Sequence, residues 1–246
     1  MINITRHEKA PESLNVPEIR DYIKSAIQHV NAPENFEKPE KPASYRNGDL
    51  LEAFDRDFFS KCYLTEKKFS NSWSMDIDHF IPQNERPDLI FDWNNLFPAD
   101  HHANMMKPRR TPDGGYLDPC GPNDDVENEI IYSLSALGFD PDFMARDNTN
   151  AKAVNTCNLL HRLHRGHDQN TKNVTKSLCH AIHEKYVTIH KKIIEYYRYQ
   201  EGSQEKFQAL RDLKDHLSRK SSYTMLCRSI PAVRVLNQDL NGGLFD

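Results

Sequence analysis

The longest regular pattern in the sequence is helical and extends from Thr171 to Gln200. Its apolar residues recur at intervals of three or four, which is the spacing of one face of an α-helix. They are Val174, Leu178, Ile182, Tyr186, Ile189, Ile193 and Tyr197. This face is expected to be core or a partner surface, and the pattern predicts a chain that is helical from Asp147 onward.

Shorter segments carry helical signals as well. Val16–Val30 has Pro17 and Glu18 at its start and apolar residues at helical spacing. Helices are also predicted over residues 48–64, 150–166 and 203–218, whereas the prolines and charges of residues 31–48 predict an extended loop. The tail, residues 240–246, is expected to be mobile, although Leu244 and Phe245 could dock on a partner.

Composition narrows the class of protein. The 246 residues carry 32 Lys and Arg against 36 Asp and Glu, a formal net charge of −4. Free-standing nucleic-acid binders are often strongly basic, so contact with nucleic acid must come from a local basic patch or from a partner. The five widely spaced cysteines predict reduced thiols in a cytoplasm. No stretch approaches the ~18 apolar residues of a membrane span, so no membrane contact is expected.

The segment that carries chemistry is Met75–Lys107, "MDIDHFIPQNERPDLIFDWNNLFPADHHANMMK". It contains three histidines, four asparagines and five aspartates. Residues 75–80 alternate apolar and polar, as a half-buried strand does, and residues 93–98 are predicted to pair with them. Residues 100–108 are predicted to form a short helix that Pro108 stops.

A strand, loop, strand and short helix can hold one divalent ion between hairpin and helix. Phosphodiester hydrolysis needs a base near neutral pKa and a hard cation on oxygen ligands, and His79, Asp78 and Asn104 supply these groups. Because Asp78 and His79 are adjacent on a strand, their side chains should point to opposite faces unless the hairpin twists. The amide of Asn95 is expected to tie the loop to the backbone.

These residues resemble an HNH nuclease motif: Asp-His, then Asn-Leu, then Asn with Lys three positions later. The resemblance implies that Asp78 and Asn104 hold Mg²⁺ or Mn²⁺, that His79 is the general base and that Asn95 is the middle asparagine of the site. The form "DIDH-x-x-PQ" is also similar to the HNH domain of RNA-guided CRISPR nucleases. The implied fold is mainly α with a small embedded ββα-metal (HNH) module.

The same resemblance extends to residues around the core of the motif. It implies an auxiliary role beside the metal for Asp76 and His102, and nucleic-acid contacts for Lys107, Arg109 and Arg110; Lys107 could instead face the backbone of the site. His101 and His102 could each touch phosphate or metal-bound water, or could merely cap the helix. Three segments are expected, packed as one unit: residues 1–60, the module at 61–110, and a helical region at 111–246.

A wider resemblance involves three further stretches: "MINITRHEKAPESL" at the N-terminus, "YLDPCGPNDD" at 116–125 and "AVNTCNLLHRLHR" at 153–165. They resemble the HNH proteins associated with retrons and the Septu system, the PtuB-like family. This resemblance implies an anti-phage effector that works beside a PtuA-like ATPase, with the surrounding helices docking that partner.

One feature of many HNH proteins is replaced in this sequence. Where they carry two Cys-x-x-Cys pairs for a structural zinc, this chain has Lys61, Leu64, Asp100 and Ala103. A structural zinc is therefore not expected, and packing of Leu64, Phe69, Trp73 and Trp93 is predicted in its place. Two Cys-x-x-x-His pairs, starting at Cys157 and Cys179, could bind zinc, although chance explains them as well.

The lost cysteines keep a second class of function open, a catalytically degenerate HNH protein that serves as a binding or scaffold subunit. A specific RNase, acting for example on tRNA, is a third possibility, because the site chemistry tolerates either sugar. The sequence does not determine the choice between DNA and RNA, the sequence that is cut, the trigger, the stoichiometry of the complex or the presence of a retron.

Overall fold

The computed structural model describes residues 1–7, 9–42, 46–134, 140–166 and 169–246, except the side chains of residues 170 and 174. Helix takes 52% and strand 9% of the structure, so the predicted mainly helical class is confirmed. The longer helices are α1 (Pro17–Asn31), α2 (Gly48–Phe58), α5 (Ala151–Arg165), α6 (Gln169–Arg198), α7 (Gln204–Leu217) and α9 (Pro231–Asp239).

Shorter elements connect them. They are α3 (His101–Met106), α4 (Val126–Glu129), α8 (Thr224–Arg228) and the 3₁₀ turns η1 (Glu12–Asn15), η2 (Ser72–Ser74), η3 (Pro87–Leu89) and η4 (Trp93–Asn95). The described residues contain two antiparallel sheets, each of two strands: β1 (Asp76–His79) with β2 (Leu96–Ala99), and β3 (Ile130–Leu134) with β4 (Pro141–Ala145). Among these described residues, no helix has the length and apolar character that a membrane span requires.

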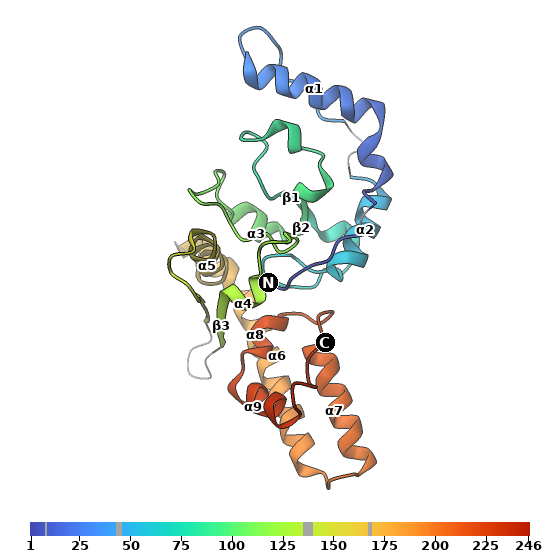
Figure 1. Cartoon of the computed structure of the whole chain (residues 1–246), viewed down its shortest axis with the longest axis vertical. Coiled ribbons are helices and arrows are strands. Elements are labelled where there is room, and N and C mark those ends of the chain that lie inside the picture. Colours follow the sequence, from blue (N-terminus) through green and yellow to red (C-terminus); the bar gives the residue numbers. More distant parts are fainter. Residues whose placement is uncertain (8, 43–45, 135–139, 167–168) are drawn as a thin grey trace.

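The chain is elongated, with α1 at one end and the α6–α7 pair at the other (Figure 1). The β1–β2 hairpin and α3 lie between them, flanked by α2 on one side and α5 on the other. The middle of the molecule is thus where segments from both halves of the sequence meet.

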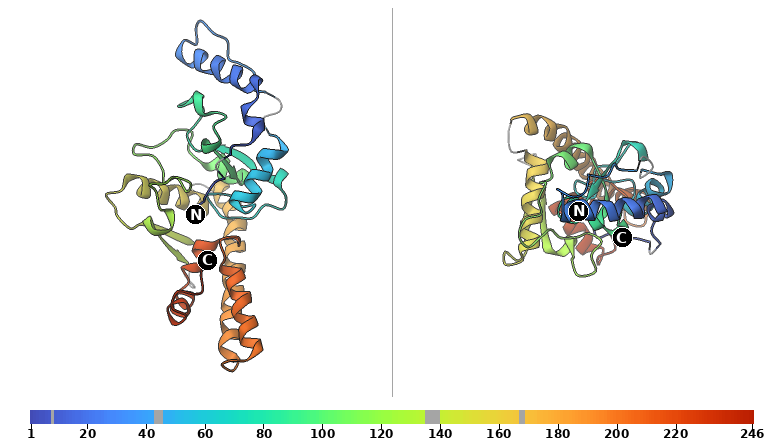
Figure 2. Two further views of the ribbon diagram at one scale, coloured as in Figure 1. Left: turned by 45° about the vertical axis from the view of Figure 1, so that its right-hand side comes forward. Right: turned by 90° about the horizontal axis from the view of Figure 1, so that it is seen from above.

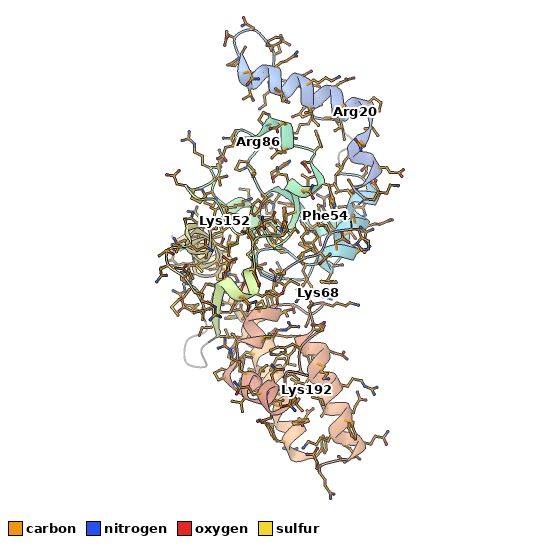
Figure 3. The ribbon with its side chains drawn as sticks, viewed as in Figure 1. Arg20, Phe54, Lys68, Arg86, Lys152 and Lys192 are labelled. Carbon is orange, nitrogen blue, oxygen red and sulfur yellow. The ribbon has the colours of Figure 1, made fainter. Side chains whose placement is uncertain are left out.

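An aromatic cluster holds the hairpin against α2. The ring of Phe54 on α2 is fully buried and lies 5.3 Å from the ring of Trp93 and 5.8 Å from that of Phe58, in the dense packing between α2 and the hairpin (Figure 3). Phe97 on β2 contacts Phe58 as well, at 5.7 Å between ring centroids. Apolar burial of this kind fixes where β2, and therefore its partner β1, can lie.

The predicted second helix ends earlier than expected. α2 begins at Gly48 but stops at Phe58, because Phe59 and Ser60 adopt left-handed backbone angles with φ of 57° and 55°. The prediction continued this helix to Leu64 because its apolar spacing does not end at Phe58. Lys61 instead pairs with Lys68 in an isolated β-bridge, so tertiary pairing overrides helix propensity here.

The second sheet is absent from the sequence-based prediction. β3 pairs with β4 from Ile130 opposite Ala145 to Leu134 opposite Pro141. Buried and exposed residues alternate along β3, with Ile130, Tyr132 and Leu134 buried. This period of two is the signal that could have identified the strand. The predicted residues 93–98 also needed a correction: Trp93–Asn95 is a 3₁₀ turn and the strand starts at Leu96.

The helices α6 and α7 form an arm that extends away from the rest of the chain (Figures 1 and 2). Ile182, Ile189 and Leu213 are fully buried between its helices and their neighbours. The ammonium of Lys192 on α6 lies 3.0 Å from the carboxylate of Asp212 on α7, and Figure 3 labels this lysine on the arm.

Tyr197, on the apolar face that was expected to be core or a partner surface, is 55% exposed. The expectation of a mobile tail is wrong. The tail docks on its own chain: Leu244 is buried, and the guanidinium of Arg228 on α8 lies 4.8 Å from the ring centroid of Phe245. A cation–π contact and apolar burial together hold residues that the sequence left free.

Candidate functional site

The candidate site lies where the β1–β2 hairpin meets α3. Asp76 of β1 is opposite Ala99 of β2, and Asp78 is opposite Phe97. The short helix α3 follows β2 directly, and the side chain of Asp100 caps it by accepting a hydrogen bond from the backbone N–H of His102 at 3.2 Å. His101 and Asn104 of this helix reach the carboxylate of Asp76 on β1.

Residues from β1, the following loop and α3 surround one cavity of about 540 Å³. Its lining includes Asp78, His79 and Gln83 from the first half of the motif and Asn104, Lys107 and Arg109 from the second. Asp78 and His79 therefore reach the same cavity although they are neighbours at the end of a strand.

The carboxylate of Asp78 is anchored through one oxygen. Its Oδ2 accepts hydrogen bonds from the hydroxyl of Tyr63 at 2.5 Å and from the ammonium of Lys107 at 2.7 Å. Among the described residues no hydrogen bond to its Oδ1 is found. A carboxylate held in this way is oriented and keeps one oxygen for a further partner.

Lys107 is itself fixed by the end of β1. Besides Asp78, its ammonium donates to the carbonyl oxygens of His79 at 2.7 Å and Phe80 at 3.1 Å. Burial lowers the pKa of Lys107, although the nearby carboxylate of Asp78 acts in the opposite direction. Of the two roles that the resemblance allowed for Lys107, the structure displays the contact with the backbone of the site.

The imidazole of His79 has two distinct nitrogens. Nε2 lies 2.8 Å from the carbonyl oxygen of Ile90, so it carries the proton and donates it there. Nδ1 is then an acceptor, and it receives a hydrogen bond from the side-chain amide of Gln83 at 3.0 Å. Burial lowers the pKa of His79, which the hydrogen bond to Ile90 only partly offsets. The ring is thus a neutral acceptor held by the loop between the strands.

Asn104 contacts Asp76 instead of Asp78. Its amide Nδ2 donates to Oδ2 of Asp76 at 3.2 Å, and the same oxygen lies 2.9 Å from Nδ1 of His101. The second auxiliary residue of the prediction, His102, makes no such contact: its backbone N–H joins the cap and its ring is exposed. The histidine beside Asp76 is therefore His101.

Asn95 ties the loop of the hairpin, as its predicted structural role requires. Its Oδ1 accepts from the backbone N–H of Ile81 at 2.7 Å, and its Nδ2 donates to the carbonyl oxygens of Ile81 and Leu89, each at 3.1 Å. The side chain is buried, whereas Asn94 beside it is exposed. These bonds tie Ile81, near the start of the loop that follows His79, and Leu89 within it to Asn95.

The two arginines of the basic run occupy different places. Arg109 lines the cavity, and Arg110 is exposed outside that lining. Arg162 of α5 donates to the carbonyl oxygen of Met106 at 2.7 Å, which fastens α5 to the end of α3. The basic side chains that line the cavity thus include Lys107 and Arg109.

Of the four positions where many HNH proteins have zinc-binding cysteines, two carry paired charges and two carry buried apolar side chains. Lys61 is buried and donates to the carbonyl oxygens of Arg219 at 2.7 Å and Ser221 at 2.9 Å. Asp100 pairs with Lys67 at 2.7 Å, while Leu64 and Ala103 are buried.

The four predicted packing residues behave differently from one another. Leu64 and Trp93 are buried and Phe69 packs against the core, but the prediction for Trp73 is wrong, because this side chain is 67% exposed. It lies in η2 at the surface, where the guanidinium of Arg46 lies 6.0 Å from its ring centroid.

A cation in this site would meet side-chain oxygens without hydrogen-bond partners among the described residues, and not a cluster of charged ligands. Among the described residues no group of three or more His, Cys, Asp and Glu could hold a metal. Asp78 and Asn104 each present one side-chain oxygen, and such oxygens suit a hard divalent ion that keeps several waters.

The residues of the two Cys-x-x-x-His pairs have other partners. A ring nitrogen of His161 lies 2.9 Å from the carboxylate of Asp142, and the thiol of Cys179 donates to the carbonyl oxygen of His164 at 3.1 Å.

Tyr63 and Gln83 were given no role in the sequence analysis, and His101 was left ambiguous. Gln83 stands in the quoted form "DIDH-x-x-PQ", and its place four residues after His79 is a signal that could have found it. His101 required a choice between adjacent histidines, which only the orientation of α3 makes. Tyr63 lies outside the motif, and no pattern in the sequence points to it.

Comparison of the chain with protein-family models, with curated proteins and with solved structures finds no match. The function is therefore argued from the geometry of the site and from the motif.

Proposed function

We propose that this chain is a metal-dependent HNH endonuclease that hydrolyses phosphodiester bonds of nucleic acid. The observation that carries the proposal is the shared cavity of His79, Asp78 and Asn104, residues that the motif singles out and that come from β1 and α3. In this proposal the β1–β2 hairpin and α3 would be the elements of an HNH module.

Each group is prepared for its proposed task. Asp78 and Asn104 would hold one Mg²⁺ or Mn²⁺ through their Oδ1 atoms, because Lys107 and Tyr63 occupy the other oxygen of Asp78 and Asp76 occupies the amino group of Asn104. When bound, the ion stabilises charge on the phosphate and on the leaving oxygen. His79 would take a proton from the attacking water at Nδ1, after that water replaces the amide of Gln83.

A partner completes the proposal. We propose that the chain is the effector of an anti-phage complex of the PtuB-like kind and works with a PtuA-like ATPase in the cytoplasm. The net charge of −4 favours a partner that supplies part of the grip on nucleic acid. Large apolar side chains on the arm are exposed, with Ile194 at 57% and Phe207 at 64%, and they suit docking to a protein surface.

The first experiment tests cleavage. The full chain is incubated with duplex DNA and with total RNA, with and without the ATPase, in Mg²⁺, Mn²⁺ or EDTA. His79→Ala should reduce the rate by about 10²-fold or more, the usual contribution of general base catalysis. His180→Ala, which removes an exposed histidine from α6, is the matched control and should cleave as the wild type does.

Two results would contradict the nuclease proposal: cleavage that persists in EDTA, or equal rates for wild type and His79→Ala. Comparison of the cleavage rates on DNA and on RNA identifies the substrate. A chain that binds the ATPase but cleaves neither substrate would favour the scaffold alternative. Co-purification of the ATPase with wild type, but not with an Ile194→Ser, Phe207→Ser variant, would place the partner on the arm.

A further inference from the structure

We infer that Asp76 and His101 position the side-chain amide of Asn104 so that its oxygen faces the cation. This inference rests on the proposed function, because it concerns the same ion. Asp76 and His101 would not touch the ion or the substrate; they would act through Asn104.

An asparagine needs such help because its amide has two dissimilar ends. The carbonyl oxygen can bind a hard cation, whereas the amino group carries two protons and cannot. Rotation of the amide by half a turn exchanges the two ends at almost no steric cost. An unsupported Asn104 would therefore present the wrong atom to the ion for part of the time.

Asp76 removes this ambiguity. Its Oδ2 lies 3.2 Å from Nδ2 of Asn104, and a carboxylate only accepts hydrogen bonds. The amino group must then face Asp76, and Oδ1 is left for another partner. Asp76 starts β1, two residues before Asp78 on the same face of the strand, so it supports the site from beside the carboxylate proposed to bind the ion.

His101 in turn fixes Asp76. Its Nδ1 lies 2.9 Å from the same Oδ2, and it precedes Asn104 by three positions on α3, so both side chains share one face of that helix. The Asp76 side chain is 30% exposed, and without a second contact it could turn toward water. Outer residues of this kind are worth 10–100-fold in metal affinity in characterised proteins.

The experiment measures Mn²⁺ affinity without nucleic acid, by electron paramagnetic resonance of free Mn²⁺ in a titration of the full chain. Asp76→Ala should weaken the Kd about 10-fold or more, and His101→Ala about threefold. Asp76→Asn keeps an oxygen that accepts from Asn104, so its Kd should stay within about threefold of wild type. Thermal unfolding of each variant verifies that the fold is intact.

The neighbouring variant His102→Ala separates the two histidines. The inference expects its Kd within about twofold of wild type, and an effect larger than that of His101→Ala would overturn it. A wild-type Kd for Asp76→Ala would overturn it as well. So would an equal loss in Asp76→Asn and Asp76→Ala, since Asp76 would then act through its charge as a ligand.

Failure of the inference can be told from failure of the proposed site. If wild type and Asn104→Ala bind Mn²⁺ equally, or wild type does not bind it, the proposed cation site is wrong, and the inference with it. If Asn104→Ala abolishes binding while Asp76→Ala leaves it unchanged, the site stands and only the positioning role falls.

Discussion

The β1–β2–α3 unit and the α6–α7 arm use burial in opposite ways. The unit buries polar and charged side chains, Asp78, His79 and Lys107, and gives them hydrogen-bond partners. The arm buries apolar residues such as Ile189 and leaves Phe207 exposed. Burial of a charge is costly unless it is paired. The unit offsets this cost with ion pairs and hydrogen bonds, whereas the arm combines buried apolar contacts with a partly exposed ion pair between Lys192 and Asp212.

The largest expected effect breaks the charge pair of the unit. Lys107→Met leaves the Asp78 carboxylate buried with one partner fewer, and should lower the free energy of unfolding by about 4 kcal/mol in urea denaturation. The double variant Lys107→Met, Asp78→Asn removes the charge as well and should recover most of this loss. A single variant that loses less than about 1 kcal/mol would show that the unit does not depend on this pair.

A smaller loss of unfolding free energy is expected when Asn95, which ties the hairpin loop, is replaced. Asn95→Ala leaves backbone groups of Ile81 and Leu89 without their partner, which should cost about 2–3 kcal/mol. The adjacent Asn94→Ala, at an exposed position, should stay within about 0.5 kcal/mol of wild type. Equal losses in the two variants would remove the distinction between the buried and the exposed asparagine.

A buried histidine outside the unit extends the comparison to pH. Burial lowers the pKa of His164 to about 4, and the described residues provide no partner for its Nε2. The unfolded chain, whose histidine has an ordinary pKa near 6.5, binds the proton more readily than the folded chain does. The free energy of unfolding is therefore highest above about pH 6.5 and declines as pH falls toward about 4.

The expected loss between about pH 7.5 and about pH 5 is about 2 kcal/mol in urea denaturation. His164→Phe keeps a ring against Phe143, whose centroid lies 4.8 Å away, and should be less sensitive to pH by that amount. An unchanged pH dependence in this variant would assign the acid sensitivity to other groups.

The smallest effect is expected on the arm. Phe207→Ser replaces a side chain that is 64% exposed, so the free energy of unfolding should change by no more than about 0.5 kcal/mol. A loss above about 1.5 kcal/mol would mean that this residue contributes to the core, and the contrast between arm and unit would then be weaker.

The sequence predicted elements better than it predicted their boundaries. The periodicity of residues 171–200 located α6, and alternation located β1. The end of α2 was missed because Phe58 is followed by two left-handed residues, a conformation that apolar spacing does not report. β3 and β4 were also missed: the prediction assigned no strand to residues 126–146, although buried residues alternate along β3.

The candidate site follows the same division. The resemblance of one motif to HNH nucleases indicated Asp78, His79 and Asn104, whereas strand period alone would place Asp78 and His79 on opposite faces. Tyr63 comes from before the hairpin, and its hydroxyl meets Asp78 only through the tertiary fold. The choice of His101 beside Asp76 depends on the rotation of α3, which the Asp100 cap and the packing of the helix set.

By itself, then, the sequence determined the mainly helical class and the long α6 helix. Local periodicity encodes these features, since each depends on neighbours within a few residues. The tertiary structure decided which oxygen of Asp78 is occupied, which atom of Asn104 is held, and that the tail packs on Arg228. Such contacts join residues far apart in the chain, and only the competition among all packings selects them.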